Sequence, residues 1–168
     1  REIMGPDFSE AQIAAVSTDK EIAYQKAYRA HLQPVAGFLP FLQTAQESGL
    51  PVALATSANQ FNIDFTLAGL GLAGALTAVI GAEDIENSKP HPEIFLKASA
   101  ALGVAPEACL VFEDSFMGIE AAHRAHMDAY AILTTLRAEE ALALPNVIGA
   151  APDFLELAHV FFGDGEKA

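Results

Sequence analysis

Three polar clusters in this sequence come after apolar segments, two of them directly and that of Lys89 after eight residues, and each contains residue types that could bind a phosphate group or a metal ion. In residues 56–58 (Thr-Ser-Ala) a hydroxyl precedes the free N–H groups of an expected helix, an arrangement that suits an anion. Lys89 could place its ammonium group against a phosphate and a carboxylate. Glu113 and Asp114 are adjacent carboxylates, and such oxygen-rich sites suit Mg²⁺.

Each cluster also has an ordinary structural interpretation. Ser, Thr and Asn are preferred helix caps, so the segment 56–59, taken alone, favours a cap. Asp114 or Ser115 could cap the following helix, although this leaves Glu113 without a role. Lys89 could be a solvent-exposed lysine, yet it immediately precedes two turn-forming prolines in a chain with only 9 basic residues. The residues alone therefore leave capping and ligand binding both open.

The elements expected around these clusters alternate between strand and helix. Short apolar runs predict strands at 51–56, 77–80, 109–112, 129–133 and, weakly, 147–148. Helical spacing and caps predict helices at 20–32, 38–45, 59–70, 93–102, 116–125, 138–144 and from 153. Strands that are apolar on both faces and alternate with helices indicate an α/β fold, a parallel sheet covered by helices. Ligands of such sheets bind beyond the carboxyl ends of the strands, where all three clusters lie.

Composition narrows the class of protein. A chain of 168 residues with 52% hydrophobic residues suits one domain of ordinary size, with or without a small appendage. Its net charge of −13 argues against nucleic acid and anionic membranes as partners, because phosphate binding needs clustered Lys and Arg. Residues 65–82 carry no charge, but their glycines and acidic flanks argue against a membrane span. The single cysteine, Cys109, fits a reducing compartment and a cytoplasmic location.

Three segments, in order, resemble motifs of the haloacid dehalogenase-like superfamily. They are Val-Ala-Leu-Ala-Thr-Ser-Ala at 52–58, Gly-Ala-Glu-Asp-Ile-Glu-Asn-Ser-Lys-Pro-His-Pro-Glu-Ile-Phe at 81–95 and Leu-Val-Phe-Glu-Asp-Ser-Phe-Met-Gly-Ile-Glu-Ala-Ala at 110–122. They look like the family's second, third and fourth motifs, and the most similar branch is that of the β-phosphoglucomutase-like phosphatases. The resemblance divides the chain into part of a helical cap at 1–33 and an α/β core at 34–168.

This resemblance implies roles for the three clusters. Thr56 would bind the transferring phosphoryl group together with the backbone N–H of Ser57, and Lys89 would offset the negative charge between phosphate and nucleophile. Glu113 and Asp114 would hold Mg²⁺. The implied activity is Mg²⁺-dependent hydrolysis of a small phosphate monoester, such as a sugar phosphate. The substrate-binding set would be Thr56, Ser57, Ala58 and Lys89.

One motif of the family is absent, because no Asp-x-Asp occurs anywhere in the chain. In the family this motif ends the first, central strand and supplies the nucleophilic aspartate, the acid–base aspartate and one metal ligand. We therefore expect a chain that lacks its first central strand, an N-terminally truncated piece that is inactive alone. The alternative is a non-catalytic module that binds phosphate or a partner. A phosphomutase is disfavoured, because no basic residue follows Gly5 in Pro-Asp-Phe-Ser-Glu at 6–10.

Three further features have competing interpretations. Residues 69–74 match the dinucleotide fingerprint Gly-x-Gly-x-x-Gly, but they follow an expected helix instead of a strand, so we interpret them as a helix end. His123 and His126 have a spacing that could share a metal, but no further ligands complete a zinc site, so we interpret them as partly exposed helix residues. Cys109 opens an apolar strand, which favours a small buried residue over a nucleophile.

Overall fold

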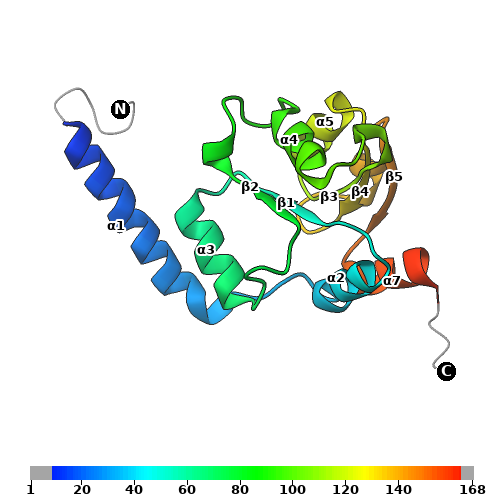
Figure 1. The fold of residues 1–168 in the computed structure, drawn as a ribbon, viewed down its shortest axis with the longest axis horizontal. Helices are drawn as coiled ribbons and strands as arrows, with labels where there is room; N and C mark the ends of the chain where they lie inside the picture. Colours follow the sequence, from blue (N-terminus) through cyan, green and yellow to red (C-terminus); the bar gives the residue numbers. More distant parts are fainter. Residues whose placement is uncertain (1–8, 164–168) are drawn as a thin grey trace.

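The computed structural model describes residues 9–163, in which parallel strands form two sheets with helices packed against them (Figure 1). The helices are α1 (Glu10–Tyr28), α2 (Phe38–Glu47), α3 (Gln60–Gly69), α4 (Glu93–Leu102), α5 (Phe116–Arg124), α6 (Ala138–Leu142) and α7 (Phe154–Phe162), with short 3₁₀ turns η1 (Arg29–His31), η2 (Ala82–Asp84) and η3 (Pro106–Ala108). The strands are β1 (Ala53–Ala55), β2 (Ala78–Ile80), β3 (Leu110–Glu113), β4 (Asp128–Ile132) and β5 (Val147–Ala151). The predicted α/β class, with a parallel sheet covered by helices, is confirmed.

Strands β3 and β4 are covered by side chains of other elements on both faces. Successive side chains of a strand point to opposite sides, so neighbouring residues of one strand pack in different clusters. Val111 of β3 packs in one cluster with Ile94 of α4 and Ile119 of α5. Its neighbour Phe112 packs on the opposite cluster, formed mainly by α2 and α7. Ile94 and Ile119 are fully buried, and each contributes about 1.5–3 kcal/mol of transfer free energy. These two clusters fix the orientation of β3, and with it the direction in which the residues after the strand leave the sheet.

Aromatic rings hold α2 and α7 against β3. The ring centroids of Phe41 and Phe112 lie 5.4 Å apart, and those of Phe41 and Phe154 lie 5.2 Å apart. Gly37, which precedes α2, has a φ of 76°, and a Cβ there would overlap the backbone at the start of α7. Glycine is therefore required at this close approach.

The sheet is divided into two parts. Strand β1 pairs only with β2, and β3 pairs only with β4, so each has one edge without a strand partner among the described residues. Helix α4 packs across β1 and β2 and places Ile94 and Phe95 in the same cluster as Val111 of β3. Helix α4 therefore contacts both the β1–β2 sheet and the β3–β4–β5 sheet, although no strand-to-strand hydrogen bonds join the two. This arrangement is expected for a fold that lacks its first central strand.

The prediction for the first helix was wrong at its start. Helix α1 begins at Glu10, not near residue 20, and Ser9 is its N-cap. The hydroxyl of Ser9 accepts from the Gln12 backbone N–H at 3.3 Å, while the Gln12 side chain accepts from the Ser9 N–H at 3.0 Å. This reciprocal capping box satisfies two otherwise free donors. The polar residues 17–19 lie inside the helix and do not cap it.

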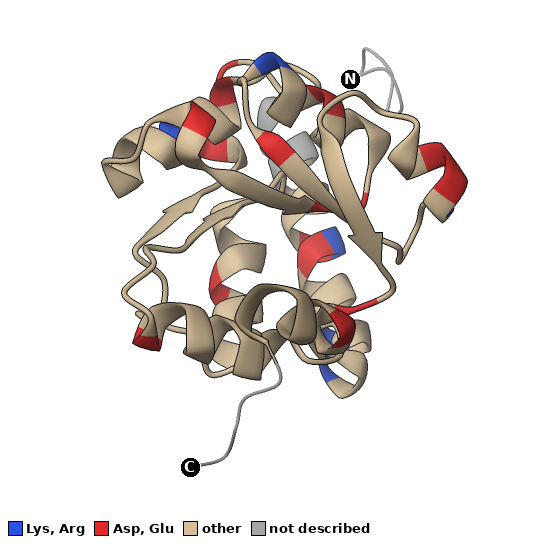
Figure 2. Cartoon of the chain, turned by 90° about the vertical axis from the view of Figure 1, so that its right-hand side faces the viewer, with Lys and Arg blue, Asp and Glu red and all other residues tan. Residues whose placement is uncertain are grey.

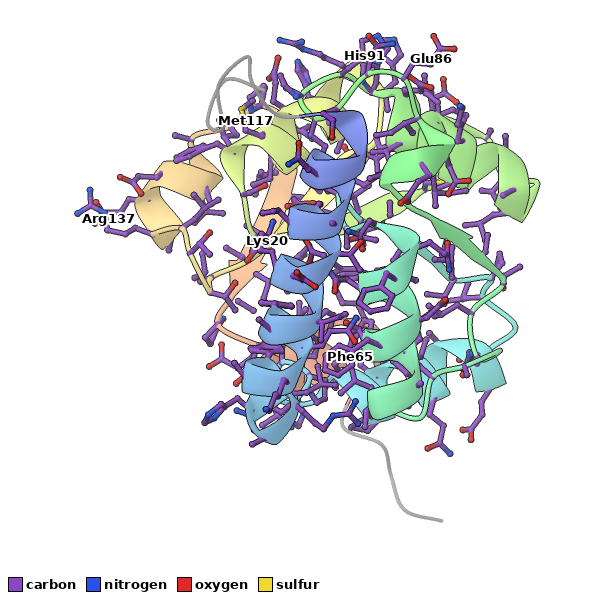
Figure 3. All side chains as sticks on the ribbon, turned by 90° about the vertical axis from the view of Figure 1, so that its left-hand side faces the viewer. Lys20, Phe65, Glu86, His91, Met117 and Arg137 are labelled. Atoms are coloured by element: carbon purple, nitrogen blue, oxygen red, sulfur yellow. The ribbon has the colours of Figure 1, made fainter. Side chains whose placement is uncertain are left out.

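Helix α1 lies alongside α3 (Figure 3). The Gln25 side-chain amide donates to the Phe61 carbonyl at 3.0 Å and to the Asn62 side chain at 3.2 Å. The guanidinium of Arg29 lies 5.3 Å from the ring centroid of Phe65. Polar contacts of α1 and the cation–π contact of η1, which follows it, thus contribute to joining this part of the chain to α3, the helix that follows the first polar cluster. The cap and core boundaries at 1–33 and 34–168 remain a prediction.

The uncharged segment 65–82 does not form one helix. It contains the end of α3, a series of turns and strand β2. Gly69 is the last residue of α3 and residues 70–74 follow the helix, so the interpretation of the glycine pattern as a helix end is confirmed. No helix of the described residues combines the length and the apolar character that a membrane crossing requires.

The expectation that both histidines lie on the helix after the acidic pair was wrong for His126. Helix α5 ends at Arg124, and His126 has a φ of 59°. Its N–H donates to the His123 carbonyl at 3.0 Å, and the Met127 N–H donates to the Ala122 carbonyl at 2.9 Å. These bonds form a Schellman motif, in which the left-handed position usually holds glycine.

We expect His126→Gly to stabilise the chain by about 0.5–1 kcal/mol. Glycine adopts a positive φ without strain, and this gain exceeds the larger loss of chain entropy that glycine undergoes on folding. Urea unfolding monitored by circular dichroism measures the change. His123→Gly is the matched control, since it places glycine within α5 and should destabilise by roughly 0.3–0.5 kcal/mol, the helix-propensity difference between the two residues. Equal effects of the two substitutions would contradict this account.

Candidate functional site

Lys89 and Glu113 form an enclosed ion pair at the carboxyl end of β3. The Lys89 Nζ donates to Glu113 Oε2 at 2.7 Å, and each side chain is only 12% exposed. The ammonium also lies 4.9 Å from the ring centroid of Phe95 in α4. Since removing one member of such a pair leaves a costly unpaired charge, the two residues depend on each other. The structure thus joins two of the three clusters that the sequence singled out.

The second oxygen of Glu113 is held by the start of α5. Glu113 Oε1 accepts from the Ser115 hydroxyl at 2.7 Å and from its backbone N–H at 3.2 Å. The Ser115 hydroxyl in turn accepts from the Gly118 N–H at 3.1 Å, so Ser115 is the helix cap. A Cβ at Gly118 would overlap the Glu113 carboxyl group. The cap and the acidic pair therefore coexist, and Asp114 is not used for capping.

Asp114 is half-buried and is held by residues that follow β4. Its Oδ2 accepts from the Thr134 hydroxyl at 2.6 Å, and the Thr135 hydroxyl donates to its backbone carbonyl. Neither threonine was predicted as a site residue from the sequence. The rule that ligand-binding residues follow strands could have found them, because only Leu133 separates them from the end of β4.

A pocket of about 190 Å³ opens beside the acidic pair. Its polar side contains the two carboxylates and the Thr134 hydroxyl, and its remaining walls are apolar. The lining residues are Val35, Phe112, Glu113, Asp114, Ile132, Thr134 and Phe154. This combination can bind a small polar ligand or a hydrated cation against an otherwise apolar wall.

The cluster at 56–58 lies at the carboxyl end of β1. Thr56 donates its N–H to the Ile80 carbonyl at 3.0 Å and accepts from the Ala58 N–H through its hydroxyl at 3.2 Å. The cap of α3 is Asn59, which accepts from the Asn62 N–H at 2.9 Å, so Thr56 and Ser57 are not needed for capping. In the described residues no hydrogen bond joins this cluster to Lys89 or Glu113.

The donor set fits Mg²⁺ only in part. Among residues 9–163 no group of three or more His, Cys, Asp or Glu side chains is arranged to hold a metal ion. Glu113 and Asp114 supply two carboxylates, but Lys89 and Ser115 each engage one oxygen of Glu113, and Thr134 engages Oδ2 of Asp114. Proteins commonly bind Mg²⁺ through one or two carboxylates, with waters and substrate phosphates completing six oxygen ligands. The pair therefore suits Mg²⁺ that is shared with a further oxygen donor.

The competing chemistries have less support from the geometry. His123 and His126 are both exposed, and their arrangement around the helix end forms no zinc site with other described residues. Cys109 is half-buried, and burial, together with the nearby Glu107, raises the pKa of its thiol. A raised pKa disfavours the reactive thiolate, in agreement with the packing interpretation.

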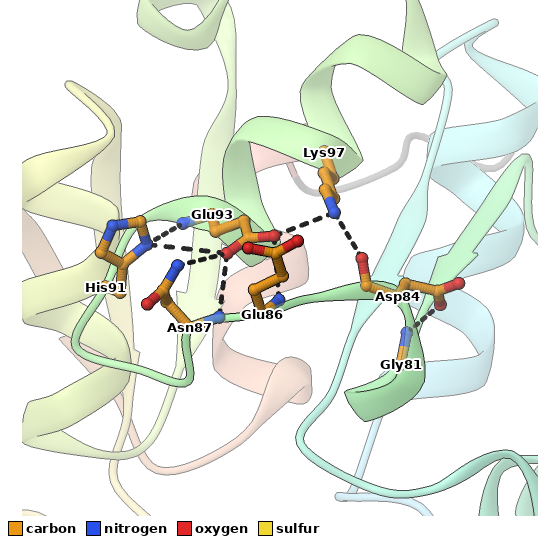
Figure 4. Close-up of polar contacts among 7 residues, drawn as sticks. All are labelled: Gly81, Asp84, Glu86, Asn87, His91, Glu93 and Lys97. Atoms are coloured by element: carbon orange, nitrogen blue, oxygen red, sulfur yellow. Dashed lines mark hydrogen bonds and ion pairs between the residues drawn. The ribbon is translucent and has the colours of Figure 1, made fainter.

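A second polar cluster surrounds Glu93, the first residue of α4 (Figure 4). Its carboxylate accepts from the backbone N–H groups of Glu86 at 3.0 Å and Asn87 at 2.9 Å, and Lys97 lies 2.9 Å away. The ammonium of Lys97, the two backbone N–H groups and the side-chain amide of Asn87 together lower the pKa of Glu93 from 4.5 to about 2.

Because the folded pKa of Glu93 is depressed, its stabilising effect is present above pH 4.5 and is lost as the pH falls toward 2. We expect Glu93→Gln to lower the melting temperature at pH 7, and the gap to wild type to shrink steadily toward pH 3. Thermal unfolding across this range measures the gap. Glu120→Gln, which removes only an exposed pair with Arg124, should leave a much smaller gap at every pH. A gap for Glu93→Gln that grows with acidity would contradict the assignment.

The fold and site define an α/β protein with a lysine-balanced acidic pair beyond the carboxyl ends of its parallel strands. Residues 4–126 match the sequence model of the haloacid dehalogenase-like hydrolases, and the chain belongs to this family. The resemblance drawn from the three motifs is thereby confirmed.

Individual relatives support this assignment. The chain is 34% identical over 143 residues to the validoxylamine A 7'-phosphate phosphatase of Streptomyces hygroscopicus subsp. limoneus, covering 82% of this chain and 67% of the relative. It is 40% identical over 79 residues to a fructose-1-phosphate phosphatase of Escherichia coli, covering 47% and 42%. A solved hydrolase of the family from Entamoeba histolytica shares the fold, with a TM-score of 0.80, 24% identity and coverage of 92% and 71%. The chain spans only 10%, 42% and 41% of three further relatives.

Proposed function

We propose that this chain is part of a Mg²⁺-dependent phosphatase that hydrolyses a small phosphate monoester, such as a sugar phosphate. The observation that carries the proposal is the contact of 2.7 Å between Lys89 and Glu113, with Asp114 beside it at the end of β3. Relatives named as phosphatases of phosphorylated sugars and related compounds support the substrate class. A phosphomutase is the weaker alternative, because the segment after Gly5 offers no basic residue for a second phosphate; residues 6–8 of that segment lie outside the described residues.

The residues present would bind and neutralise the transferring phosphoryl group. The Thr56 hydroxyl and the Ser57 N–H would donate to its oxygens, with Ala58 completing the loop, and Lys89 would offset their charge. Glu113 and Asp114 would hold Mg²⁺, which when bound offsets charge on the same oxygens. Phosphoryl transfer depends mainly on such positioning and charge stabilisation. Lys89 already faces Glu113, so its ammonium would lie between metal site and phosphate.

The chain contains no Asp-x-Asp, so the carboxylate for covalent catalysis must come from elsewhere. We place it on a segment outside this sequence, at the end of a strand that would pair with the free edges of β1 and β3. The same absence favours the second candidate, a non-catalytic module that binds phosphate or a partner. The net charge of −13 disfavours nucleic acid as that partner, and the single cysteine supports a cytoplasmic location.

The test uses the protein encoded by the whole gene. We expect Mg²⁺-dependent release of phosphate from fructose 1-phosphate or p-nitrophenyl phosphate that EDTA abolishes. Lys89→Ala and Asp114→Asn should each lower kcat by about 10²–10³-fold, because both remove charge stabilisation from the transition state. Lys20→Ala is the control, since its side chain is 75% exposed. Full turnover in both site variants would reject the phosphatase assignment, and phosphate binding without turnover would favour the binding module.

A further inference from the structure

The loop that carries Lys89 is tied at both ends to α4. It leaves η2 near Ile85, presents Lys89, and enters the helix at Glu93. Besides the backbone N–H groups of Glu86 and Asn87, the Glu93 carboxylate accepts from the Asn87 side-chain amide at 3.0 Å. One carboxylate therefore closes the loop by binding its first residues to the helix that begins where the loop ends (Figure 4).

Lys97 strengthens this closure from the next turn of α4. Its ammonium lies 2.9 Å from Glu93 Oε1 and also donates to the Asp84 backbone carbonyl, just before the loop. Asp84 itself accepts from the Gly81 N–H at 2.7 Å. The segment from β2 to α4 is thus held by a continuous series of charge-assisted bonds, which are stronger than neutral ones.

Lys89 is the one residue of this loop that reaches the acidic pair. Its long side chain has many rotamers, and fixing it costs up to about 2 kcal/mol of conformational entropy. A loop free to move would add backbone entropy to that cost and shift the ammonium from the Glu113 carboxylate. The hydrogen bonds of Glu93 to Glu86 and Asn87 restrict the loop backbone, so less entropy remains to be lost when Lys89 contacts Glu113.

We propose that Glu93 is a positioning residue, whose carboxylate clamps the loop 85–92 against α4 and thereby holds Lys89 at Glu113. The role of Lys89 in phosphoryl transfer rests on the proposed function, but the clamp itself does not. It predicts that Lys89 loses its protected position when Glu93 is changed, whether or not the chain acts on phosphate.

A simpler role for Glu93 would be that of a negative charge at the N-terminus of α4, which stabilises a helix through its dipole. Aspartate supplies the same charge but is one methylene shorter, so it cannot reach Glu86 and Asn87 in the same way. Glu93→Asp therefore separates the two roles. A helix-terminal charge survives the substitution, whereas the clamp does not.

The experiment measures acetylation of individual lysines in the folded 168-residue chain by an N-hydroxysuccinimide ester, with peptide mass spectrometry as the readout. Lys89 should react slowly in the wild type, and Lys20, which is 75% exposed, is the internal reference. Relative to Lys20, Glu93→Gln and Glu93→Asp should raise the Lys89 rate about tenfold, as expected for loss of hydrogen bonds to a charged group. Glu120→Gln should leave the rate unchanged.

A milder variant covers the case in which changes at Glu93 prevent folding. Asn87→Ala removes one of the loop contacts of Glu93 and should raise the Lys89 rate about threefold, as expected for loss of one ordinary hydrogen bond. Circular dichroism identifies the folded variants. A Lys89 rate within twofold of wild type in every folded variant would overturn the proposal, and so would a rise in Glu93→Gln alone. Neither outcome bears on phosphatase activity, so the two proposals can fail separately.

Discussion

Purified alone, the chain of 168 residues should hydrolyse no phosphate monoester above the buffer rate, even with Mg²⁺ present. The residues that would bind and neutralise the phosphoryl group are present, but the chain contains no Asp-x-Asp to attack it. Loss of a nucleophile typically lowers turnover by roughly 10⁴-fold or more, far beyond the effect of any single binding residue. Release of inorganic phosphate from fructose 1-phosphate, with and without EDTA, measures the expected result.

The controls for this prediction are variants of the chain itself. Turnover that EDTA abolishes and that Asp114→Asn and Lys89→Ala also remove would show that the chain holds its own nucleophile. The proposal of an outside strand would then be rejected. Turnover that is equal in the wild type and both variants would come from a contaminating phosphatase.

Gly118→Ala should destabilise the chain by about 1 kcal/mol, against the usual preference of a helix for alanine over glycine. The new Cβ would overlap the carboxyl group of Glu113, which is held in place by Lys89 and Ser115. Overpacking of this kind costs about 1–3 kcal/mol and exceeds the gain in helix propensity of about 1 kcal/mol when the neighbour cannot move freely. Urea unfolding gives the free energy of unfolding for both forms.

A double-mutant cycle provides the control for this substitution. Glu113→Ala removes the carboxylate, so adding Gly118→Ala in that background should cost nothing or stabilise by up to about 1 kcal/mol. An equal cost of Gly118→Ala in both backgrounds would show that the overlap with Glu113 is not the cause. In the wild-type background the substitution should also raise the reactivity of Lys89, because Glu113 would be displaced from it.

The core of the fold was predictable because its pattern is local. The apolar run before Glu113 and the helix from Phe116 lie within a residue or two of their predicted bounds, since strong periodicity and a Ser cap mark them. Helix α1 was predicted too short, because the polar cluster at 17–19 resembles a cap while the actual cap, Ser9, lies further upstream. Strand β5 was predicted too short for a different reason: its pairing with β4 stabilises Gly149 and its neighbours in a conformation their sequence does not favour.

The site was predictable to the extent that it follows strand ends. Lys89 and Glu113 were singled out separately, and the structure brings them into contact over 24 positions of sequence. Thr134 and Thr135 were missed because threonine is common after strands; the strand-end rule points to their position, but the fold is needed to show that the Thr134 hydroxyl reaches Asp114. The anchoring of Lys89 by Glu93 was also missed, since glutamate at a helix start is ordinary in sequence.

The distribution of charge around Lys89 governs how an anion would reach it. Acidic side chains are spread over helices and loops, with few basic ones among them (Figure 2), and the one cation of the site is largely enclosed. A dianion approaching from solution therefore meets repulsion from a net charge of −13 first, and attraction only close to Lys89. At physiological ionic strength this repulsion is screened beyond about 8 Å. Added salt should therefore speed the association of an anionic ligand with this chain. In a protein whose surface charge is opposite to that of its ligand, added salt slows association instead.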